Sequence, residues 1–366
     1  MRELVIDLAA IERNYQIMKA HGSGVLAMAV VKANAYGHGM IEVAKHLDGK
    51  VDYFGVADID EALELRAAGI EAPILAWLHS PTEDFVAAID TEIELGLSTV
   101  DQLNRVAEAA TAAQGKARVH LKVDTGLGRN GAAAIDWPQV VTTAKALAEM
   151  GLIEVVAVFS HLSSTSESDD LAQIQRFEDS VALARDLGLS FELRHLTASD
   201  GTLNYPQAHY EMVRIGVALY GLSPFVDHTS TDYGITPAMT ARSVVVQTKR
   251  VASDEGISYG YLHRTTGETT LALVPVGYAE GLPRTSTGRA EVAIGGKRYK
   301  ILARIAMDQF VVDVGDDQVL AGDEVVIFGN GSDGAPTADE LARADDTINY
   351  EIVTRMGGRF TRKYLG

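Results

Sequence analysis

A lysine directly follows a short apolar run near the start of the chain, where its amine could act as a nucleophile. Lys32 closes the run GVLAMAVV, and Tyr36 and the turn YGHG follow it. A lysine at the end of a buried strand loses hydration, which favours the neutral amine over the ammonium ion. A neutral amine can condense with an aldehyde, so Lys32 is a candidate Schiff-base former. The alternative interpretation is a solvated lysine at a strand end.

Further polar groups stand at the ends of later apolar runs, where catalytic and phosphate-binding groups lie in parallel α/β barrels. A serine hydroxyl and the backbone amides beside a glycine can hold a phosphate. An arginine there stays charged and only donates hydrogen bonds. The alternative for this arginine is an ion pair with a strand-end acid such as Glu211. The candidates are His161 in VFSHLSS, Ser199 in RHLTASDG, and Arg214, Gly216 and Val217 in MVRIGVALYG.

The segment HLKVDTGLGRNG carries two cations and three glycines. Side chains alternate along a strand, so Lys122 lies on the same side as His120 and Asp124. An ion pair between Lys122 and Asp124 is therefore one interpretation. The glycines also match the dinucleotide fingerprint G-x-G-x-x-G, but the next helical pattern begins only around residues 136–138, so we expect no dinucleotide site. These glycines are Gly126, Gly128 and Gly131.

Eight short apolar runs, most followed by a segment of helical character, fill the first two thirds of the chain. Such alternation predicts parallel strands connected by helices, closed into a (β/α)₈ barrel. One helical segment ends at Gly188, a residue type common just beyond helix ends. The predicted strands are 26–32, 53–57, 73–78, 92–98, 118–124, 154–161, 191–198 and 211–216, and clear helical patterns span 100–113 and 171–188.

The pattern changes after about Asp232, where strand-like runs alternate with glycine and aspartate. We therefore predict a barrel domain over residues 1–230 and a mainly β domain over 231–366, with the boundary in the polar stretch 226–236. Two helices are predicted in the second domain, over 337–343 and 347–356. The strand-like runs are TARSVVVQTKRV, TTLALVPVGY, EVAIGG, RYKILARIAM, QFVVDVG and DEVVIFG.

Composition excludes several classes of function. The 366 residues include 32 Lys and Arg against 50 Asp and Glu, a net charge of −18, which repels nucleic acid and anionic membranes. The chain has no cysteine, so disulfides, thiolate nucleophiles and cysteine metal sites are absent. The N-terminus lacks a signal-peptide core, and no apolar stretch is long enough to cross a bilayer. We expect a cytoplasmic protein.

The motifs around Lys32, Arg214, GISYGY and TINYE together resemble those of the alanine racemases, and the resemblance covers nearly the whole chain. It implies a TIM-type (β/α)₈ barrel with a C-terminal mainly β domain, and pyridoxal 5′-phosphate (PLP) as the cofactor. The implied reaction interconverts L- and D-alanine and supplies D-alanine for peptidoglycan. The resemblance also implies a head-to-tail homodimer whose subunits share active sites.

The resemblance assigns a role to each candidate residue. Lys32 would bind PLP, and Lys32 and Tyr259 of the partner subunit would move the Cα proton on opposite faces of a PLP Schiff base. Arg214 would face the pyridine nitrogen, and His161 would link Arg214 to the catalytic tyrosine. The implied phosphate ligands are Tyr36, Ser199, Gly216, Val217 and Tyr350. The implied substrate contacts are Arg129, Tyr278 and the Met307 amide, with Lys122 carbamylated to orient Arg129.

Some residues depart from the family pattern, and other functions remain open. Ala198, Ile215 and Ala306 stand where asparagine, proline and cysteine are usual, and the atypical Trp77 is predicted to pack in the barrel. A broader-specificity racemase and a decarboxylase of the same architecture are alternatives. A decarboxylase is expected to place a carboxylate where Arg214 stands. A non-catalytic PLP carrier would resemble the barrel alone, and a metal-dependent barrel hydrolase would want an H-x-H pair after the first strand.

Overall fold

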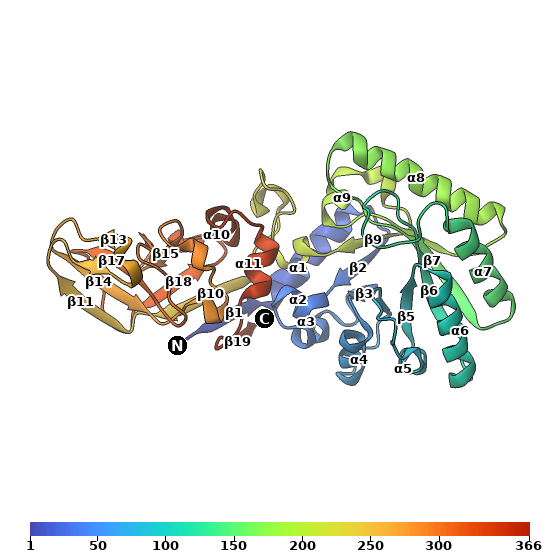
Figure 1. Ribbon diagram of the computed structural model, residues 1–366, viewed down its shortest axis with the longest axis horizontal. Helices are drawn as coiled ribbons and strands as arrows, with labels where there is room; N and C mark the ends of the chain where they lie inside the picture. Colours follow the sequence, from blue (N-terminus) through green and yellow to red (C-terminus); the bar gives the residue numbers. More distant parts are fainter. The chain divides into compact units, whose positions relative to one another are not determined.

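The computed structural model describes all 366 residues, and the chain divides into two compact units (Figure 1). The barrel unit comprises Tyr15–Ala33 and Met40–Leu219. The β unit comprises Met1–Asn14, Asn34–Gly39 and Tyr220–Gly366. This division differs from the predicted single boundary in the stretch 226–236, because the β unit already begins at Tyr220 and also includes two N-terminal segments.

The barrel unit is built on one sheet of eight parallel strands, in the order β8-β7-β6-β5-β4-β3-β2-β9. Each of the eight predicted strands overlaps one observed strand, which confirms the predicted barrel architecture. The strands are β2 Leu26–Val30, β3 Tyr53–Val56, β4 Ile74–Ala76, β5 Ile93–Leu97, β6 Ala117–Lys122, β7 Ile153–Phe159, β8 Leu193–His195 and β9 Met212–Ile215.

The sheet's two end strands, β8 and β9, are held together by backbone and side-chain bonds. Arg214 N–H donates to the carbonyl of Thr197 at 3.1 Å, just beyond β8. At the other end of the pair, the Glu211 carboxylate accepts hydrogen bonds from the backbone N–H and the guanidinium of Arg194 at 2.7–2.9 Å. These contacts join β8 and β9, the first and last strands of the sheet. The carboxyl ends of all eight parallel strands therefore lie at the same end of the barrel, and polar groups that follow the strands lie there together.

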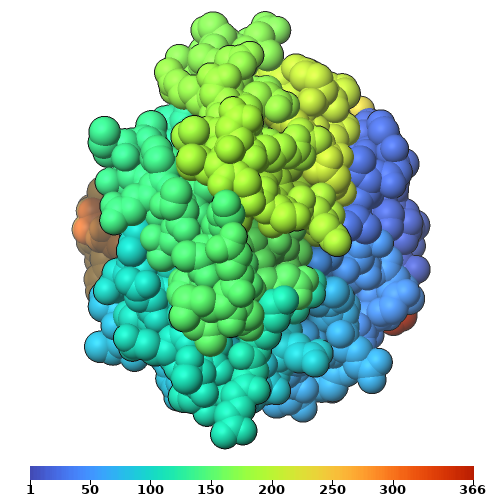
Figure 2. Space-filling model, turned by 90° about the vertical axis from the view of Figure 1, so that its right-hand side faces the viewer, coloured from blue at the N-terminus to red at the C-terminus, as the bar shows by residue number.

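Helices follow the strands along the chain, and the segments of the barrel unit succeed one another over the face in Figure 2 in sequence order, from blue through green to yellow. Side chains of Thr99 and Ser166 cap the two longest predicted helices by accepting from backbone N–H groups three residues on. Gly188 lies just past the end of α8 with φ +82°, as its predicted role at a helix end requires. The helices are α3 Met40–Leu47, α4 Ile59–Ala67, α5 Phe85–Asp90, α6 Val100–Ala113, α7 Trp137–Glu149, α8 Glu167–Asp186 and α9 Ser199–Asn204.

Trp77, directly after β4, packs against neighbouring strands that leave room for it. A Cβ atom on Gly55 of β3 would lie 2.8 Å from the indole, and one on Gly96 of β5 would lie 2.9 Å from the Trp77 Cβ. Any larger residue at either glycine would collide with the tryptophan. Trp77 therefore packs in the barrel, as predicted.

The β unit contains three sheets, and its C-terminal segment forms two α-helices, α10 Ala338–Ala344 and α11 Asn349–Arg355, which confirm the two predicted helices. The main sheet has the order β16-β15-β18-β10-β1-β19, and smaller sheets are β11-β14-β17 and β12-β13. The strands are β1 Glu3–Asp7, β10 Met239–Val244, β11 Gln247–Val251, β12 Gly256–Ile257, β13 His263–Arg264, β14 Thr269–Val274, β15 Glu291–Ile294, β16 Lys297–Lys300, β17 Phe310–Gly315, β18 Glu324–Phe328 and β19 Thr361–Leu365.

The N-terminal strand β1 explains why residues 1–14 belong to the β unit. It pairs antiparallel with β10 and parallel with β19, and its Leu4 and Ile6 side chains are fully buried. This strand joins segments that lie more than two hundred residues apart in the sequence. A boundary placed only where the local pattern changes misses such pairing.

The segment after Lys32 forms a left-handed turn. In α2 (Lys32–Tyr36), the four residues Ala33 to Tyr36 have φ between +52° and +54°, a conformation that L-residues rarely adopt. Within the β unit, Arg362 Nε donates to the carbonyl of Gly37 at 2.8 Å. A Cβ on Gly37 would lie 2.4 Å from the Val353 carbonyl. The residues that follow the turn are thus fixed closely against the C-terminal elements.

None of the helices combines the length and the apolar character that a membrane span requires.

Candidate active site

The amine of Lys32 lies at the carboxyl end of β2 in a partly buried, cationic environment. Its Nζ is 5.9 Å from the centroid of the Trp77 ring. Burial lowers the pKa of Lys32, and the positive charges of Arg129 and Arg214 lower it further against the opposing effect of Glu61. This shift favours the neutral amine that a nucleophile or base needs.

Glu61 holds the backbone around this lysine. Its carboxylate accepts from the N–H of Ala33 at 2.6 Å and from the N–H of Ala57 at 2.8 Å. One carboxylate thereby joins the residue after Lys32 to the end of the neighbouring strand β3. Because Glu61 ties Ala33 to the end of β3, the backbone that carries Lys32 is held in place.

Arg214, in β9, is buried and held by several acceptors. Its NH2 group donates to the carbonyls of Ser160 and Leu196 at 2.8 and 2.9 Å and to His161 Nδ1 at 3.0 Å. Its NH1 group donates to His195 Nδ1 at 2.9 Å. Burial lowers the pKa of Arg214 to about 10, so the guanidinium still carries its charge at neutral pH. None of these bonds uses its Nε–H.

The alternative interpretation of Arg214 is wrong. Glu211, the acid proposed to pair with it, instead binds Arg194 through two guanidinium nitrogens at 2.9 and 2.7 Å. No ion pair joins Arg214 to a carboxylate. A buried guanidinium without an acid partner is rare in protein interiors, and here only neutral groups satisfy it.

The contact with Arg214 determines which nitrogen of His161 carries the proton. A guanidinium can only donate, so His161 Nδ1 accepts and Nε2 carries the hydrogen. Burial lowers the pKa of His161 well below its usual range, and the charges of Arg214 and Arg129 act in the same direction. The ring is therefore a neutral donor through Nε2, the form that a link to a tyrosine oxygen needs.

Lys122, at the end of β6, is 6% exposed and lies among other cations. Burial lowers its pKa to about 8, with Arg214 and Arg129 adding to the effect and Asp124 opposing it. Its Nζ lies 5.4 Å from the centroid of the Phe159 ring. No ion pair joins Lys122 to Asp124, whose Oδ1 instead accepts from the N–H groups of two loop glycines at 2.9 and 3.2 Å. The interpretation of Lys122 as Asp124's partner is therefore wrong.

The glycine-rich loop after β6 is a structural turn. A Cβ on Gly131 would lie 2.5 Å from the backbone nitrogen of Asp124, where Ala132 returns to pair with β6. The helix α7 begins only at Trp137, so the glycines do not open a helix. This arrangement lacks the helix start of a dinucleotide site, in agreement with the sequence analysis. Arg129 stands exposed in this loop.

The candidate phosphate ligands of the barrel unit lie together at the ends of β8 and β9. Ser199 Oγ, which is buried, accepts from the N–H groups of Gly216 at 3.0 Å and Ala218 at 3.3 Å. Val217 begins the short helix η2 (Val217–Tyr220) directly after Gly216. The structure therefore brings together Ser199, Gly216 and Val217, as an anion site built from amides and a hydroxyl would need.

The β unit brings two further predicted residues together. The rings of Tyr36 and Tyr350 lie 6.2 Å apart between centroids, and Tyr220 stacks obliquely on Tyr36 at 5.0 Å. The two predicted phosphate ligands thus belong to one aromatic cluster, although one precedes the barrel helices and the other lies near the C-terminus.

The remaining candidates, Tyr259, Tyr278 and Met307, are exposed. Their exposed fractions are 70%, 43% and 54%. Tyr278 N–H donates to the Ala306 carbonyl at 3.2 Å, so Tyr278 and Met307 lie on adjacent segments of the β unit. Tyr259 stands in the turn η4 (Tyr259–Tyr261), whose Ser258 hydroxyl donates to the Arg304 carbonyl at 2.9 Å.

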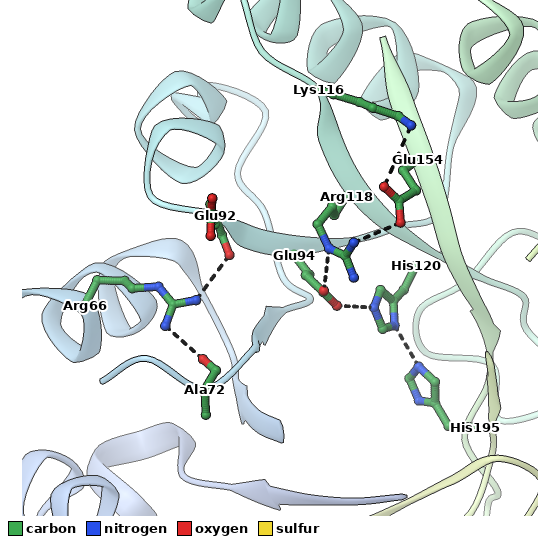
Figure 3. Close-up of polar contacts among 9 residues, drawn as sticks. All are labelled: Arg66, Ala72, Glu92, Glu94, Lys116, Arg118, His120, Glu154 and His195. Atoms are coloured by element: carbon green, nitrogen blue, oxygen red, sulfur yellow. Dashed lines mark hydrogen bonds and ion pairs between the residues drawn. The ribbon is translucent and has the colours of Figure 1, made fainter. Parts of the chain in front are cut away.

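Behind Arg214, a hydrogen-bonded chain of residues that the sequence analysis did not select runs through the barrel unit (Figure 3). It passes from His195 to His120, then to Glu94 and Arg118. The sequence did carry one signal for it: Glu94 stands inside the otherwise apolar run IELGL. A carboxylate in a buried strand requires partners from other strands.

Comparison with known proteins agrees with this architecture. The family model "Alanine racemase, N-terminal domain" matches residues 6–224, and "Alanine racemase, C-terminal domain" matches residues 238–364. The alanine racemase of Frankia casuarinae is 47% identical over 99% of this chain and 95% of its own length. That of Thermobifida fusca is 45% identical over 100% of this chain and 98% of its own length. The crystal structure of alanine racemase from D-cycloserine-producing Streptomyces lavendulae matches with a TM-score of 0.98 and 44% identity, covering 100% and 97% of the two chains. The chain belongs to the alanine racemase family.

Proposed function

We propose that this protein is a PLP-dependent alanine racemase, an isomerase that interconverts L- and D-alanine. The observation that carries the proposal is the buried, charged Arg214, satisfied only by neutral groups, in the same unit as the pKa-lowered amine of Lys32. The product D-alanine would serve as a precursor of cell-wall peptidoglycan. Following the family resemblance, we place the enzyme in the cytoplasm.

The donor set of this chain fits PLP. Lys32 offers an amine of lowered pKa for the aldehyde, and Ser199 with the Gly216 and Val217 amides would offer donors for the phosphate. By the family resemblance, Tyr36 and Tyr350 would add hydroxyl donors for the phosphate. When bound, PLP supplies an electron-withdrawing ring that makes the Cα proton of an attached amino acid removable.

Arg214 would select racemisation over other PLP reactions. Its Nε–H remains for a ring nitrogen, and a guanidinium cannot give up its proton at neutral pH. Facing Arg214, the ring nitrogen of a bound PLP would stay unprotonated, so the group would supply weaker electron withdrawal than it would opposite a carboxylate. With that weaker electron withdrawal, the acid and base residues of the chain would return the proton to Cα quickly, which favours racemisation over decarboxylation.

Two bases on opposite faces of Cα would give inversion. The Lys32 amine removes the proton from D-alanine, and Tyr259 of the partner subunit removes it from L-alanine. His161 donates through Nε2–H, which would stabilise the tyrosine oxygen once it has lost its proton. Each positioned acid or base contributes roughly 10²–10⁴-fold in rate.

Arg129 and the Met307 amide would bind the substrate carboxylate, and Tyr278 would narrow the entrance so that only a small side chain fits. We propose that Lys122 is carbamylated. The modification would convert a buried cation among cations into an anion beside Arg129, which removes the repulsion that lowers the Lys122 pKa.

A head-to-tail homodimer would complete the site. Three adjacent apolar side chains of the β unit, Tyr259, Tyr261 and Leu262, are 70%, 60% and 58% exposed. An exposed apolar cluster of this kind is typical of a protein–protein interface. In the dimer it would be covered by the partner's barrel unit, which places Tyr259 near the partner's lysine.

Chiral chromatography tests the proposal. The full chain with PLP is incubated with a panel of single enantiomers, and each amino acid is analysed for its mirror image. We expect racemisation of alanine well above that of serine, lysine and arginine, without release of carbon dioxide. Carbon dioxide release from a basic amino acid, or unchanged L-alanine at saturating PLP, would overturn the proposal.

A further inference from the structure

A continuous chain of hydrogen bonds leads from Arg214 through the barrel interior. Arg214 NH1 lies 2.9 Å from His195 Nδ1, and His195 Nε2 lies 2.9 Å from His120 Nδ1. His120 Nε2 lies 2.6 Å from Glu94 Oε2. The other Glu94 oxygen accepts from Arg118 Nε at 2.8 Å. Four strands contribute to this chain: β9, β8, β6 and β5 (Figure 3 shows it from His195 to Arg118).

The direction of every bond in this chain follows from its two ends. Arg214 only donates, so His195 Nδ1 must accept and His195 Nε2 must carry the hydrogen. His120 Nδ1 then accepts from His195, and His120 Nε2–H donates to Glu94. Both imidazoles are consequently neutral Nε2–H tautomers, because a second ring proton on either would place two donors face to face.

The carboxylate end supports this direction. Both imidazoles are fully buried and Glu94 is 2% exposed, so a wrongly directed donor would find no water to satisfy it. Burial raises the pKa of Glu94, but the hydrogen bonds from His120 and Arg118 outweigh it and leave the pKa lowered. Burial lowers the pKa of His195 well below its usual range, as a neutral ring requires.

Arg118 connects the chain to the protein surface. Its side chain is 41% exposed, and it also donates to Glu154 at 2.8 Å, which lies 3.7 Å from Lys116. The negative charge of Glu94 is thereby balanced without a proton. The carboxylate can stay ionised inside the barrel and act only as an acceptor.

We propose that Glu94 is a positioning residue for Arg214: its carboxylate locks His120 and His195 in the Nε2–H tautomer, so that His195 always presents a lone pair to the guanidinium. The lock holds NH1 on His195 while NH2 binds Ser160, Leu196 and His161. The Nε–H is then left in a fixed position for the cofactor's ring nitrogen. This last consequence rests on the proposed function, whereas the tautomer lock belongs to the protein alone.

Glu94→Gln tests the lock with little change in shape. If its oxygen stays on Arg118, a glutamine donates its NH2 group to His120 Nε2 and favours the reversed chain, although His195 Nδ1–H then faces the donor-only guanidinium of Arg214. Glu211→Gln is the matched control, because Glu211 is also paired with an arginine in the barrel but contacts no imidazole. His195→Asn is a second variant, because its amide oxygen can replace Nδ1 as acceptor while the link to His120 is lost.

The first measurement uses the cofactor-free full chain labelled with ¹⁵N in its histidines. Long-range proton–nitrogen NMR spectra report which ring nitrogen carries the hydrogen. We expect pure neutral Nε2–H rings for His120 and His195 in the unaltered protein and in Glu211→Gln, and mixed tautomers in Glu94→Gln. An imidazolium or an Nδ1–H ring at either position in the unaltered protein near neutral pH would overturn the proposal, whatever the enzyme's activity.

The second measurement uses the PLP-loaded proteins. We expect Glu94→Gln to lower kcat on the order of tenfold with little change in KM, and to alter the cofactor's absorption spectrum. Exchange of the Cα hydrogen with solvent should fall by the same factor for L- and D-alanine, because Arg214 serves both directions. His195→Asn should retain more activity than Glu94→Gln. Equal activity and spectra in Glu94→Gln and Glu211→Gln would contradict a role in positioning Arg214.

Discussion

The two units present their candidate residues in opposite ways. In the barrel unit, Arg214, His161 and Lys122 are held among neighbours that shift their pKa values. In the β unit, Tyr259 and Met307 are mostly exposed. The protonation of a group follows from the structure when its surroundings are fixed within one unit. The chemistry of an exposed tyrosine depends on what covers it, so the proposed role of Tyr259 depends on the proposed second chain.

Replacing Lys32 should have the largest effect, and it tests whether the barrel unit contains the nucleophile. We expect Lys32→Ala to lower racemisation by about 10⁴-fold or more, because covalent attachment and one base are lost together. Borohydride reduction followed by peptide mass mapping should place the coenzyme on Lys32 in the unaltered protein. Lys19→Ala is the control, because Lys19 is paired with Asp52 outside the site. Coenzyme trapped on Lys122 would show that Lys32 is not the amine that binds the coenzyme.

Replacing Tyr259 tests the dependence of the β unit on a second chain. We expect Tyr259→Phe to slow Cα exchange from L-alanine roughly 10²–10⁴-fold and to leave exchange from D-alanine nearly unchanged, since Lys32 serves that face. Tyr261→Phe is a control in the same turn. Mixed dimers of Lys32→Ala and Tyr259→Phe chains should regain activity, because one of their two shared sites is intact. No recovery on mixing would mean that each site is completed within a single chain.

A pH series on Lys122 sharpens the electrostatic side of the comparison. The folded pKa of about 8 lies below the value of 10.5 for an ordinary lysine, so the unfolded chain binds more protons between these values. The free energy of unfolding should therefore rise with pH across this window, and the penalty is largest below about pH 8. Urea unfolding in carbon-dioxide-free buffer should show this slope, and Lys122→Met should reduce it, because only the smaller contribution of Lys32 then remains. Equal slopes for the two proteins would contradict the lowered pKa.

The smallest expected effect concerns packing: the same Gly→Ala substitution should cost more stability in the barrel unit than in the β unit. Gly96→Ala would force a Cβ to within 2.9 Å of the Trp77 Cβ, whereas Gly267 in the β unit has open space around it. We expect Gly96→Ala to lower the free energy of unfolding by about 1–3 kcal/mol and Gly267→Ala to change it little. Urea unfolding curves measure both. Equal stability of the two variants would show that Trp77 can move aside.

The local pattern of the sequence predicted most elements of the fold, because each barrel strand is a short apolar run bounded by turn residues. The exceptions depend on contacts distant in sequence. β1 belongs to the β unit because β10 and β19 pair with it, and nothing within MRELVID indicates those partners. The left-handed turn was missed because KANAY contains no glycine, the residue that usually marks such a conformation.

The candidate site was predictable only where one motif contains the functional group. Lys32, Ser199 and Arg214 each stand at a strand end in a recognisable string. The chain from Arg214 to Glu94 draws single residues from four strands, and His195 and His120 each resemble an ordinary core histidine in the sequence. Only the three-dimensional arrangement shows that their nitrogens meet. For the same reason, the sequence alone could not predict that Glu211 pairs with Arg194 instead of Arg214.

The turn from Ala33 to Tyr36 has a consequence for the chirality of the chain itself. A left-handed helical conformation costs an L-residue roughly 1–2 kcal/mol, whereas the corresponding D-residue favours that conformation. D-alanine built into positions 33 and 35 by chemical ligation should therefore stabilise the loop that carries the lysine. A protein proposed to interconvert L- and D-alanine would then contain two alanine positions, 33 and 35, at which its own backbone conformation favours the D-stereoisomer.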